Sequence, residues 1–90
     1  MLSSGALALD VREPDEYAAG HVVGARLLPL GQVPARMGDL PRDRTIVVVC
    51  RSGRRSAEAT QVLLGAGFAD VLNLTGGMIA WRQAGLPVAE

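Results

Sequence analysis

Hydrophobic residues along the chain form short continuous runs, separated by segments with helical spacing. The runs lie at residues 6–11, 25–28, 45–49 and 71–74. Each run predicts a short β-strand. The third is the strongest, because the β-branched residues 46–49 follow one another without interruption. Such continuity is typical of a strand that is covered on both faces.

Signals of short helices lie between these runs. Pro14 is tolerated in a first helical turn, and the acids Asp15 and Glu16 suit a helix N-terminus. Apolar residues recur with helical period after residue 54, and Gly67 is a suitable residue to end that helix. Helices are predicted at residues 14–19, 33–37 and 54–66, and in a last short segment that carries Ile79, Ala80 and Trp81 after the turn Thr75-Gly76-Gly77.

Strands that alternate with helices predict the α/β class, with right-handed crossovers between parallel strands. The length of 90 residues suits one domain, so residues 1–90 are interpreted as a single unit. We expect a central, mostly parallel sheet of four to five short strands, flanked by helices on both faces. Ligands of such sheets bind beyond the carboxyl ends of the strands, and Cys50 directly follows the strongest strand.

Acidic and basic residues balance at nine each, which argues against a nucleic acid or an acidic membrane surface as the partner. All nine basic residues are arginines, and Arg51, Arg54 and Arg55 fall within five positions. This cluster in an otherwise neutral chain predicts a local anion site. No secretory signal or membrane-spanning run is visible, so we expect a cytoplasmic protein.

The loop after the strongest strand has the composition of an anion-binding turn. Backbone N–H groups at the start of the following helix lack intrahelical acceptors and point into a curled loop. Glycine permits the curl, serines add hydroxyl donors, and arginines add charge. The candidate site consists of Cys50 as nucleophile and, around it, Arg51, Ser52, Gly53, Arg54, Arg55 and Ser56.

Cys50 is the only cysteine, and its surroundings predict a reactive thiolate. Helix termini, N–H donors and nearby cations all favour the charged form of a thiol. The alternative is a buried structural cysteine, a common role of this residue. That alternative predicts apolar neighbours on both sides, whereas a turn rich in Gly, Ser and Arg follows Cys50.

These residues resemble the single-domain rhodaneses, a family of sulfurtransferases. The loop Cys-Arg-Ser-Gly-Arg-Arg-Ser is similar to the active-site loop of that family. Further matches in the same order are Asp10-Val11-Arg12-Glu13, Glu16-Tyr17, Gly20-His21-Val22-Val23-Gly24-Ala25, Leu74-Thr75-Gly76-Gly77-Met78-Ile79-Ala80-Trp81 and Gly85-Leu86-Pro87-Val88. Members usually carry a strand and a helix before the position of Asp10, where this chain has nine residues, so we expect that amino-terminal pair to be missing.

The resemblance implies the rhodanese-like fold and a two-step sulfur transfer. Cys50 would take the outer sulfur of a donor such as thiosulfate as a persulfide and pass it to a thiol or cyanide. The loop N–H groups would hold the persulfide, and the arginines would hold the leaving sulfite. The implied partners are a small anionic sulfur donor and a thiol acceptor, either a small molecule or a protein. No cofactor and no metal are implied.

Two alternative functions stay open. Phosphatases and arsenate reductases on a similar scaffold have five residues between the cysteine and the arginine, whereas four separate Cys50 from Arg55. The shorter loop favours a sulfur atom over a tetrahedral oxyanion. The other alternative is a persulfide relay or docking module that turns over little free thiosulfate.

Several other residues have simpler interpretations. His21 is expected to make a structural hydrogen bond rather than to serve as a general base. Asp10 and Arg12 are expected either to support the loop or to form a surface ion pair. Gly76 and Gly77 predict a tight turn rather than a phosphate site. Trp81 is assigned to the core or to a lid at the sheet edge, and Asp15 and Glu16 to ordinary acids of a first helical turn.

Overall fold

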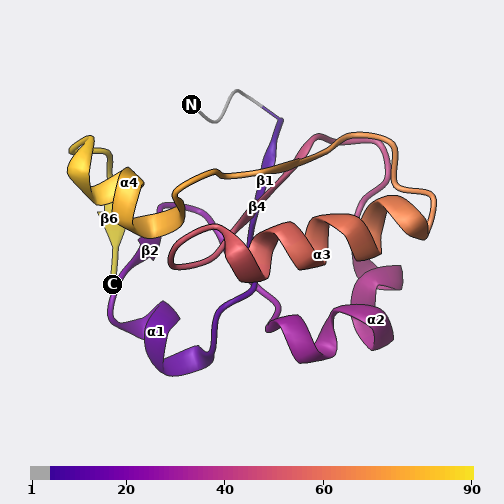
Figure 1. Ribbon diagram of the computed structural model, residues 1–90, viewed down its shortest axis with the longest axis horizontal. Helices are drawn as coiled ribbons and strands as arrows, with labels where there is room; N and C mark the ends of the chain where they lie inside the picture. The colour runs from indigo at the N-terminus through magenta and orange to yellow at the C-terminus, as the bar shows by residue number, and fades with distance from the viewer. Residues whose placement is uncertain (1–4) are drawn as a thin grey trace.

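A computed structural model describes residues 5–90 as an α/β domain (Figure 1). Residues 1–4, which belong to the segment searched for a secretory signal, lie outside the described residues. Four strands form a parallel sheet in the order β3-β1-β4-β5. They are β1 (Leu7–Asp10), β3 (Arg26–Leu27), β4 (Ile46–Val49) and β5 (Val71–Asn73). The predicted parallel sheet is confirmed, with the continuous apolar strands β1 and β4 at its centre.

A second, antiparallel pair was not predicted from the sequence. It joins β2 (His21–Val22) to β6 (Val88–Ala89), and His21 lies opposite Ala89. Each strand has two residues, which is too short for an alternating pattern to appear. No strand was expected at His21, but pairing with the carboxyl-terminal segment makes this residue part of one.

Helices cover both faces of the main sheet. They are α1 (Pro14–Ala18), α2 (Val33–Arg36), α3 (Arg54–Gly65) and α4 (Gly77–Gln83). The helix predicted at residues 33–37 is α2, which is bracketed by the 3₁₀ turns Leu30–Gln32 and Met37–Asp39. Among the described residues, none of the helices is both long and apolar enough to cross a membrane.

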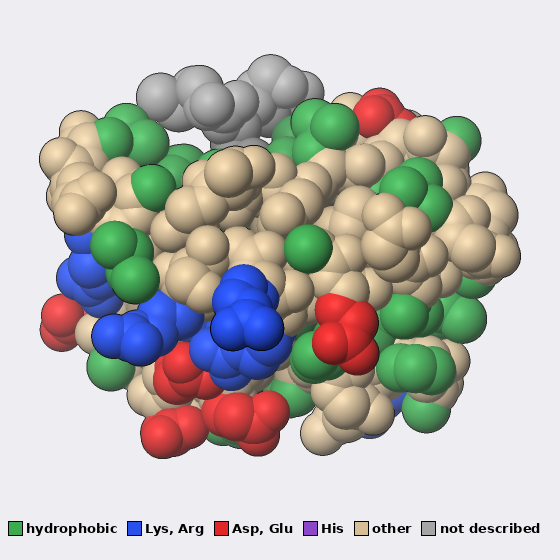
Figure 2. All heavy atoms as spheres, viewed as in Figure 1, with side chains coloured by type: hydrophobic (Ala, Val, Ile, Leu, Met, Phe, Trp, Pro, Cys, Tyr) green, Lys and Arg blue, Asp and Glu red, His purple; other side chains and the backbone are tan. Residues whose placement is uncertain are grey.

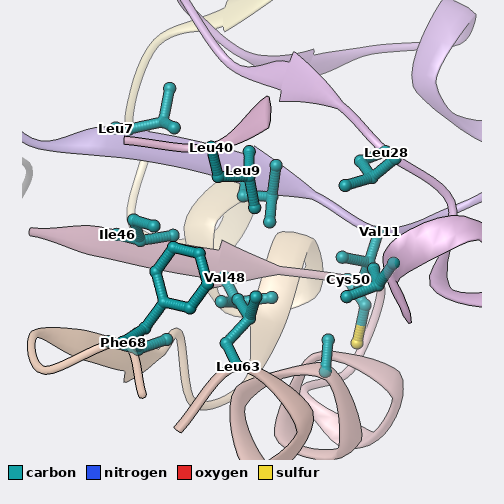
Figure 3. Packing of buried hydrophobic residues seen from close by; sticks show 13 residues of the cluster. Leu7, Leu9, Val11, Leu28, Leu40, Ile46, Val48, Cys50, Leu63 and Phe68 are labelled. Atoms are coloured by element: carbon teal, nitrogen blue, oxygen red, sulfur yellow. The ribbon is translucent and has the colours of Figure 1, made fainter. Parts of the chain in front are cut away.

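Two apolar clusters fill the space between sheet and helices. On one face, Val33 of α2 and Leu63 of α3 pack with Leu9 and Val48 of the central strands. Cys50 lies at one end of this cluster (Figure 3). On the other face, Trp81 of α4 packs against residues of the strands. The Trp81 ring is buried and its N–H donates to Pro87 O at 2.8 Å, so it belongs to the core and is not a lid.

Candidate active site at the carboxyl end of strand β4

The chain turns sharply where β4 ends, and helix α4 fixes that turn. The carbonyl of Cys50 accepts a hydrogen bond from Met78 N at 2.8 Å, and that of Arg51 accepts one from Ile79 N at 3.1 Å. Because these carbonyls point toward α4, the N–H groups that follow are free to face the sulfur. A side chain at Gly77 would overlap the Cys50 and Arg51 backbone, so this glycine allows the close approach. The prediction of a tight turn at Gly76-Gly77 is confirmed.

Gly53 places the first N–H donor against the sulfur. It has a φ of +100° at the N-terminal end of α3, a left-handed conformation that favours glycine. In this conformation its N–H lies 3.0 Å from Cys50 Sγ. The loop therefore curls around the sulfur as the sequence predicted.

Several donors surround the Cys50 thiol, which is only 1% exposed. Burial raises the pKa of this thiol. Hydrogen bonds from the Ser56 hydroxyl and from the N–H groups of Ser56, Gly53 and Ser52 lower that pKa by more than burial raises it. The net result is a pKa below the ordinary value for cysteine, which favours the nucleophilic thiolate.

Asn73, at the end of β5, organises the same loop and was not predicted. Its side-chain amide donates to Gly53 O at 3.2 Å, which fixes the amide so that Oδ1 accepts the Ser56 hydroxyl. Ser56 is fully buried and carries a single hydroxyl proton. In this structure the hydroxyl donates that proton to Asn73, and the same hydroxyl is one of the groups that lower the pKa of the Cys50 thiol. Asn73 therefore positions Gly53 and Ser56, the two residues that contact or influence the sulfur.

The arginines of the loop are not equivalent. Arg51 and Arg54 are exposed, whereas Arg55 donates to both carboxylate oxygens of Glu16, at 2.7 and 2.8 Å. Glu16 also accepts the N–H of Glu13 at 3.0 Å, so it caps α1 and joins that helix to α3. The interpretation of Glu16 as an ordinary first-turn acid is incomplete. Figure 2 shows basic side chains gathered on the face that carries the loop.

The Glu16–Arg55 pair changes the titration of both groups. The hydrogen bonds from Arg55 are the largest influence and lower the pKa of Glu16 to about 2, against the partial burial that raises it. The same contacts raise the pKa of Arg55. Glu16 is therefore ionised at neutral pH and neutralises one of the loop arginines.

Asp10 and Arg12 form a buried ion pair, so the alternative of a surface pair was wrong. The Arg12 guanidinium donates to Asp10 from Nε at 2.9 Å and from Nη2 at 2.7 Å. Its Nη2 also donates to Gly20 O at 2.8 Å. Asp10 is enclosed because β1 lies between β3 and β4 and its register brings Asp10 beside Val49. The pair therefore joins the end of β1 to the turn after α1.

His21 makes local contacts within its own segment. Its Nδ1 lies 2.8 Å from Tyr17 O, and its ring stacks on the Tyr17 ring with centroids 3.7 Å apart. Both contacts agree with the structural interpretation. The groups with the largest influence in lowering the pKa of the Cys50 thiol belong to Ser52, Gly53 and Ser56.

Comparisons with known proteins identify related chains. The family model of the rhodanese-like domain matches residues 1–84. A sulfurtransferase of Allochromatium vinosum is 46% identical over 82 residues, which cover 91% of this chain and 77% of the relative. The thiosulfate sulfurtransferase GlpE of Pseudomonas putida is 40% identical over 78 residues, with coverages of 87% and 71%.

The fold also matches solved structures. The crystal structure of a rhodanese-related protein from Thermoplasma volcanium superimposes with a TM-score of 0.90 at 32% identity, covering 94% of this chain and 84% of that protein. Some matched relatives are longer, and this chain spans between 20% and 58% of their length.

Proposed function

Because the chain belongs to the family of rhodanese-like domains, which includes sulfurtransferases, we propose that it transfers a sulfane sulfur through a persulfide on Cys50. The donor is thiosulfate or a similar anion, and the acceptor is a thiol or cyanide. The observation that carries this proposal is the lowered pKa of a cysteine thiol that lies against the Gly53 N–H. Such a thiolate is a strong nucleophile at neutral pH.

The first half-reaction loads the cysteine. The Cys50 thiolate attacks the outer sulfur of thiosulfate, and the S–S bond of the donor breaks. Sulfite leaves with the electron pair of that bond, and Cys50 carries a persulfide anion. The N–H groups of the loop stabilise this charge, as they stabilise the thiolate that precedes it. The exposed Arg51 and Arg54 attract the donor and the leaving sulfite.

The second half-reaction returns the enzyme to its starting state. An acceptor thiolate attacks the outer sulfur of the persulfide, and Sγ leaves with the electrons of the S–S bond. This sequence of covalent loading and release gives ping-pong kinetics. Arg55 is held by Glu16, so its proposed part is to line the loop at a fixed position rather than to follow the substrate.

The test is thiocyanate formation from thiosulfate and cyanide, with Cys50→Ser as the control. Mass spectra of the intact protein before and after thiosulfate show whether one sulfur atom is added. Turnover and added mass in the native protein, both lost in Cys50→Ser, are the expected results. Added mass without turnover would point to a persulfide relay with a dedicated acceptor. Absence of both would refute sulfur transfer, and phosphate esters, arsenate and docking to protein partners would be tested next.

A further inference from the structure

A groove opens beside the loop, between α1 and α4. It has a volume of about 260 Å³ and is lined by Arg12, Glu16, Ala19, Arg51, Met78, Ile79 and Arg82. Two lining residues adjoin the Cys50 backbone, because Arg51 directly follows Cys50 and Met78 N donates to Cys50 O at 2.8 Å. The groove is larger than a compact inorganic anion fills, and it therefore has room for an organic molecule.

The charged groups of the groove fall into two kinds. Arg12 and Glu16 are engaged, because Arg12 binds Asp10 and Glu16 binds Arg55. Arg51 and Arg82 are exposed, and within residues 5–90 neither makes an ion pair. The groove therefore presents two guanidinium groups that are available to an anionic ligand.

Arg82 lies at one end of the groove and contacts the turn after α1. Its side chain extends from the last turn of α4 to the turn after α1, where its Nη2 lies 3.5 Å from Ala19 O. A side chain at Gly20 would overlap this guanidinium group, so the guanidinium group would have to shift to make room for it. The Arg82 guanidinium group thus lies next to Ala19 and Gly20 at this end of the groove.

Apolar side chains also line the groove beside these two arginines. Ile79 is 42% exposed on the same helix, and Ala19 lies on the opposite side. A ligand that fits this groove has a short apolar body and a carboxylate that binds a guanidinium group in a bidentate manner. A thiol of this kind whose carboxylate binds Arg82 would direct its sulfur toward Arg51, which lines the same groove and directly follows Cys50.

We propose that this groove binds the sulfur acceptor, and that Arg82 selects acceptor thiols that carry a carboxylate. The proposal rests on the function proposed above, since it concerns the second half-reaction. The acceptor thiolate attacks the outer sulfur, the Cys50 S–S bond breaks, and Sγ leaves as a thiolate. The product is a persulfide of the carboxylated thiol, and no oxidant or reductant is needed.

The experiment compares two small thiols of similar length, 3-mercaptopropionate and 3-mercapto-1-propanol. Protein with a Cys50 persulfide is prepared with inorganic polysulfide, and the loss of the added sulfur is followed by mass spectrometry. Arg82→Gln is compared with Arg26→Gln, an exposed arginine of β3 outside the groove. Arg82→Gln is expected to slow transfer to the carboxylated thiol about tenfold, which corresponds to roughly 1.4 kcal/mol. Transfer to the neutral thiol stays within about twofold, and Arg26→Gln changes neither rate.

A second variant moves Arg82 without removing it. Gly20→Ala displaces the guanidinium group and is expected to weaken the preference for the carboxylated thiol in the same direction. Equal losses with both thiols in Arg82→Gln, or no loss with either, would overturn the proposal. Loading with polysulfide separates this test from the donor, because failure of thiosulfate alone to load Cys50 counts against the proposed donor and leaves the acceptor comparison intact.

Discussion

Replacing Glu16 with glutamine tests whether the ion pair between α1 and α3 stabilises the domain around the loop. The variant keeps the size of the side chain but removes the charge that binds Arg55 through two hydrogen bonds. An amide also presents only one acceptor oxygen to the guanidinium group. We therefore expect lower stability at neutral pH and a changed response to acid.

The magnitude follows from the pKa of Glu16, which falls from 4.5 to about 2 in the folded protein. This difference corresponds to roughly 3.4 kcal/mol at most. The Glu16 and Arg55 side chains are 28% and 35% exposed, so solvent screening reduces the expected value to about 1–2 kcal/mol. Because the pKa is lowered on folding, this stability is present above pH 4.5 and is lost as the pH falls from 4.5 toward 2.

The assay is urea unfolding of both proteins at pH 7 and at several values between pH 5 and 2.5. Glu16→Gln is expected to be less stable at pH 7 and to lose less stability with acid than the native protein. Asp15→Asn is the matched control, since Asp15 is an exposed acid in the same helical turn. This substitution is expected to lower the free energy of unfolding by about 0.3 kcal/mol. Equal losses in the two variants at pH 7, or an unchanged acid response in Glu16→Gln, would refute the reasoning.

Three further substitutions test the loop. Gly77→Ala places a methyl group on the Cys50 backbone at a positive φ and should cost about 2–4 kcal/mol in urea unfolding, whereas Gly65→Ala, in open space on α3, should be neutral or stabilise by up to about 1 kcal/mol. Ser56→Ala removes a donor that lowers the pKa of the Cys50 thiol, so iodoacetamide should alkylate it more slowly at pH 7 and the rate should rise at higher pH than in the native protein. Asn73→Leu leaves the buried Ser56 hydroxyl without its acceptor and should cost about 1–3 kcal/mol in thermal unfolding.

Sequence reasoning predicted the elements whose signal is local. The run of β-branched residues that forms β4 defines a buried strand by itself, and the helical period after residue 54 defines α3. The pair of β2 and β6 has no such signal, because two residues carry no period and their partners are separated by most of the chain. Pairing of this kind depends on where the rest of the fold places the two segments.

The same division applies to the candidate site. Cys50 and Gly53 are close in sequence, so the contact between N–H and sulfur follows from one curled loop. Glu16, Asn73 and Arg82 come from three other elements and reach the loop region only through the tertiary fold. Asp10 and Arg12 were recognised as a pair, but the choice between surface and support depended on the strands that enclose Asp10.

The loop has two proposed tasks, which are to stabilise the charged Cys50 sulfur and to attract anions, and the structure gives them mainly to different groups. The largest influences that lower the pKa of the Cys50 thiol are hydrogen bonds from the Ser56 hydroxyl and from three backbone N–H groups, and the charge of Arg55 also interacts with Cys50. Arg55 is neutralised by Glu16, while Arg51 and Arg54 extend into solvent. The backbone is fixed before any substrate binds, so it can stabilise the sulfur in every state of the cycle. The exposed arginines are left to attract the anions that bring and remove sulfur, and variants of the two groups should therefore change different steps.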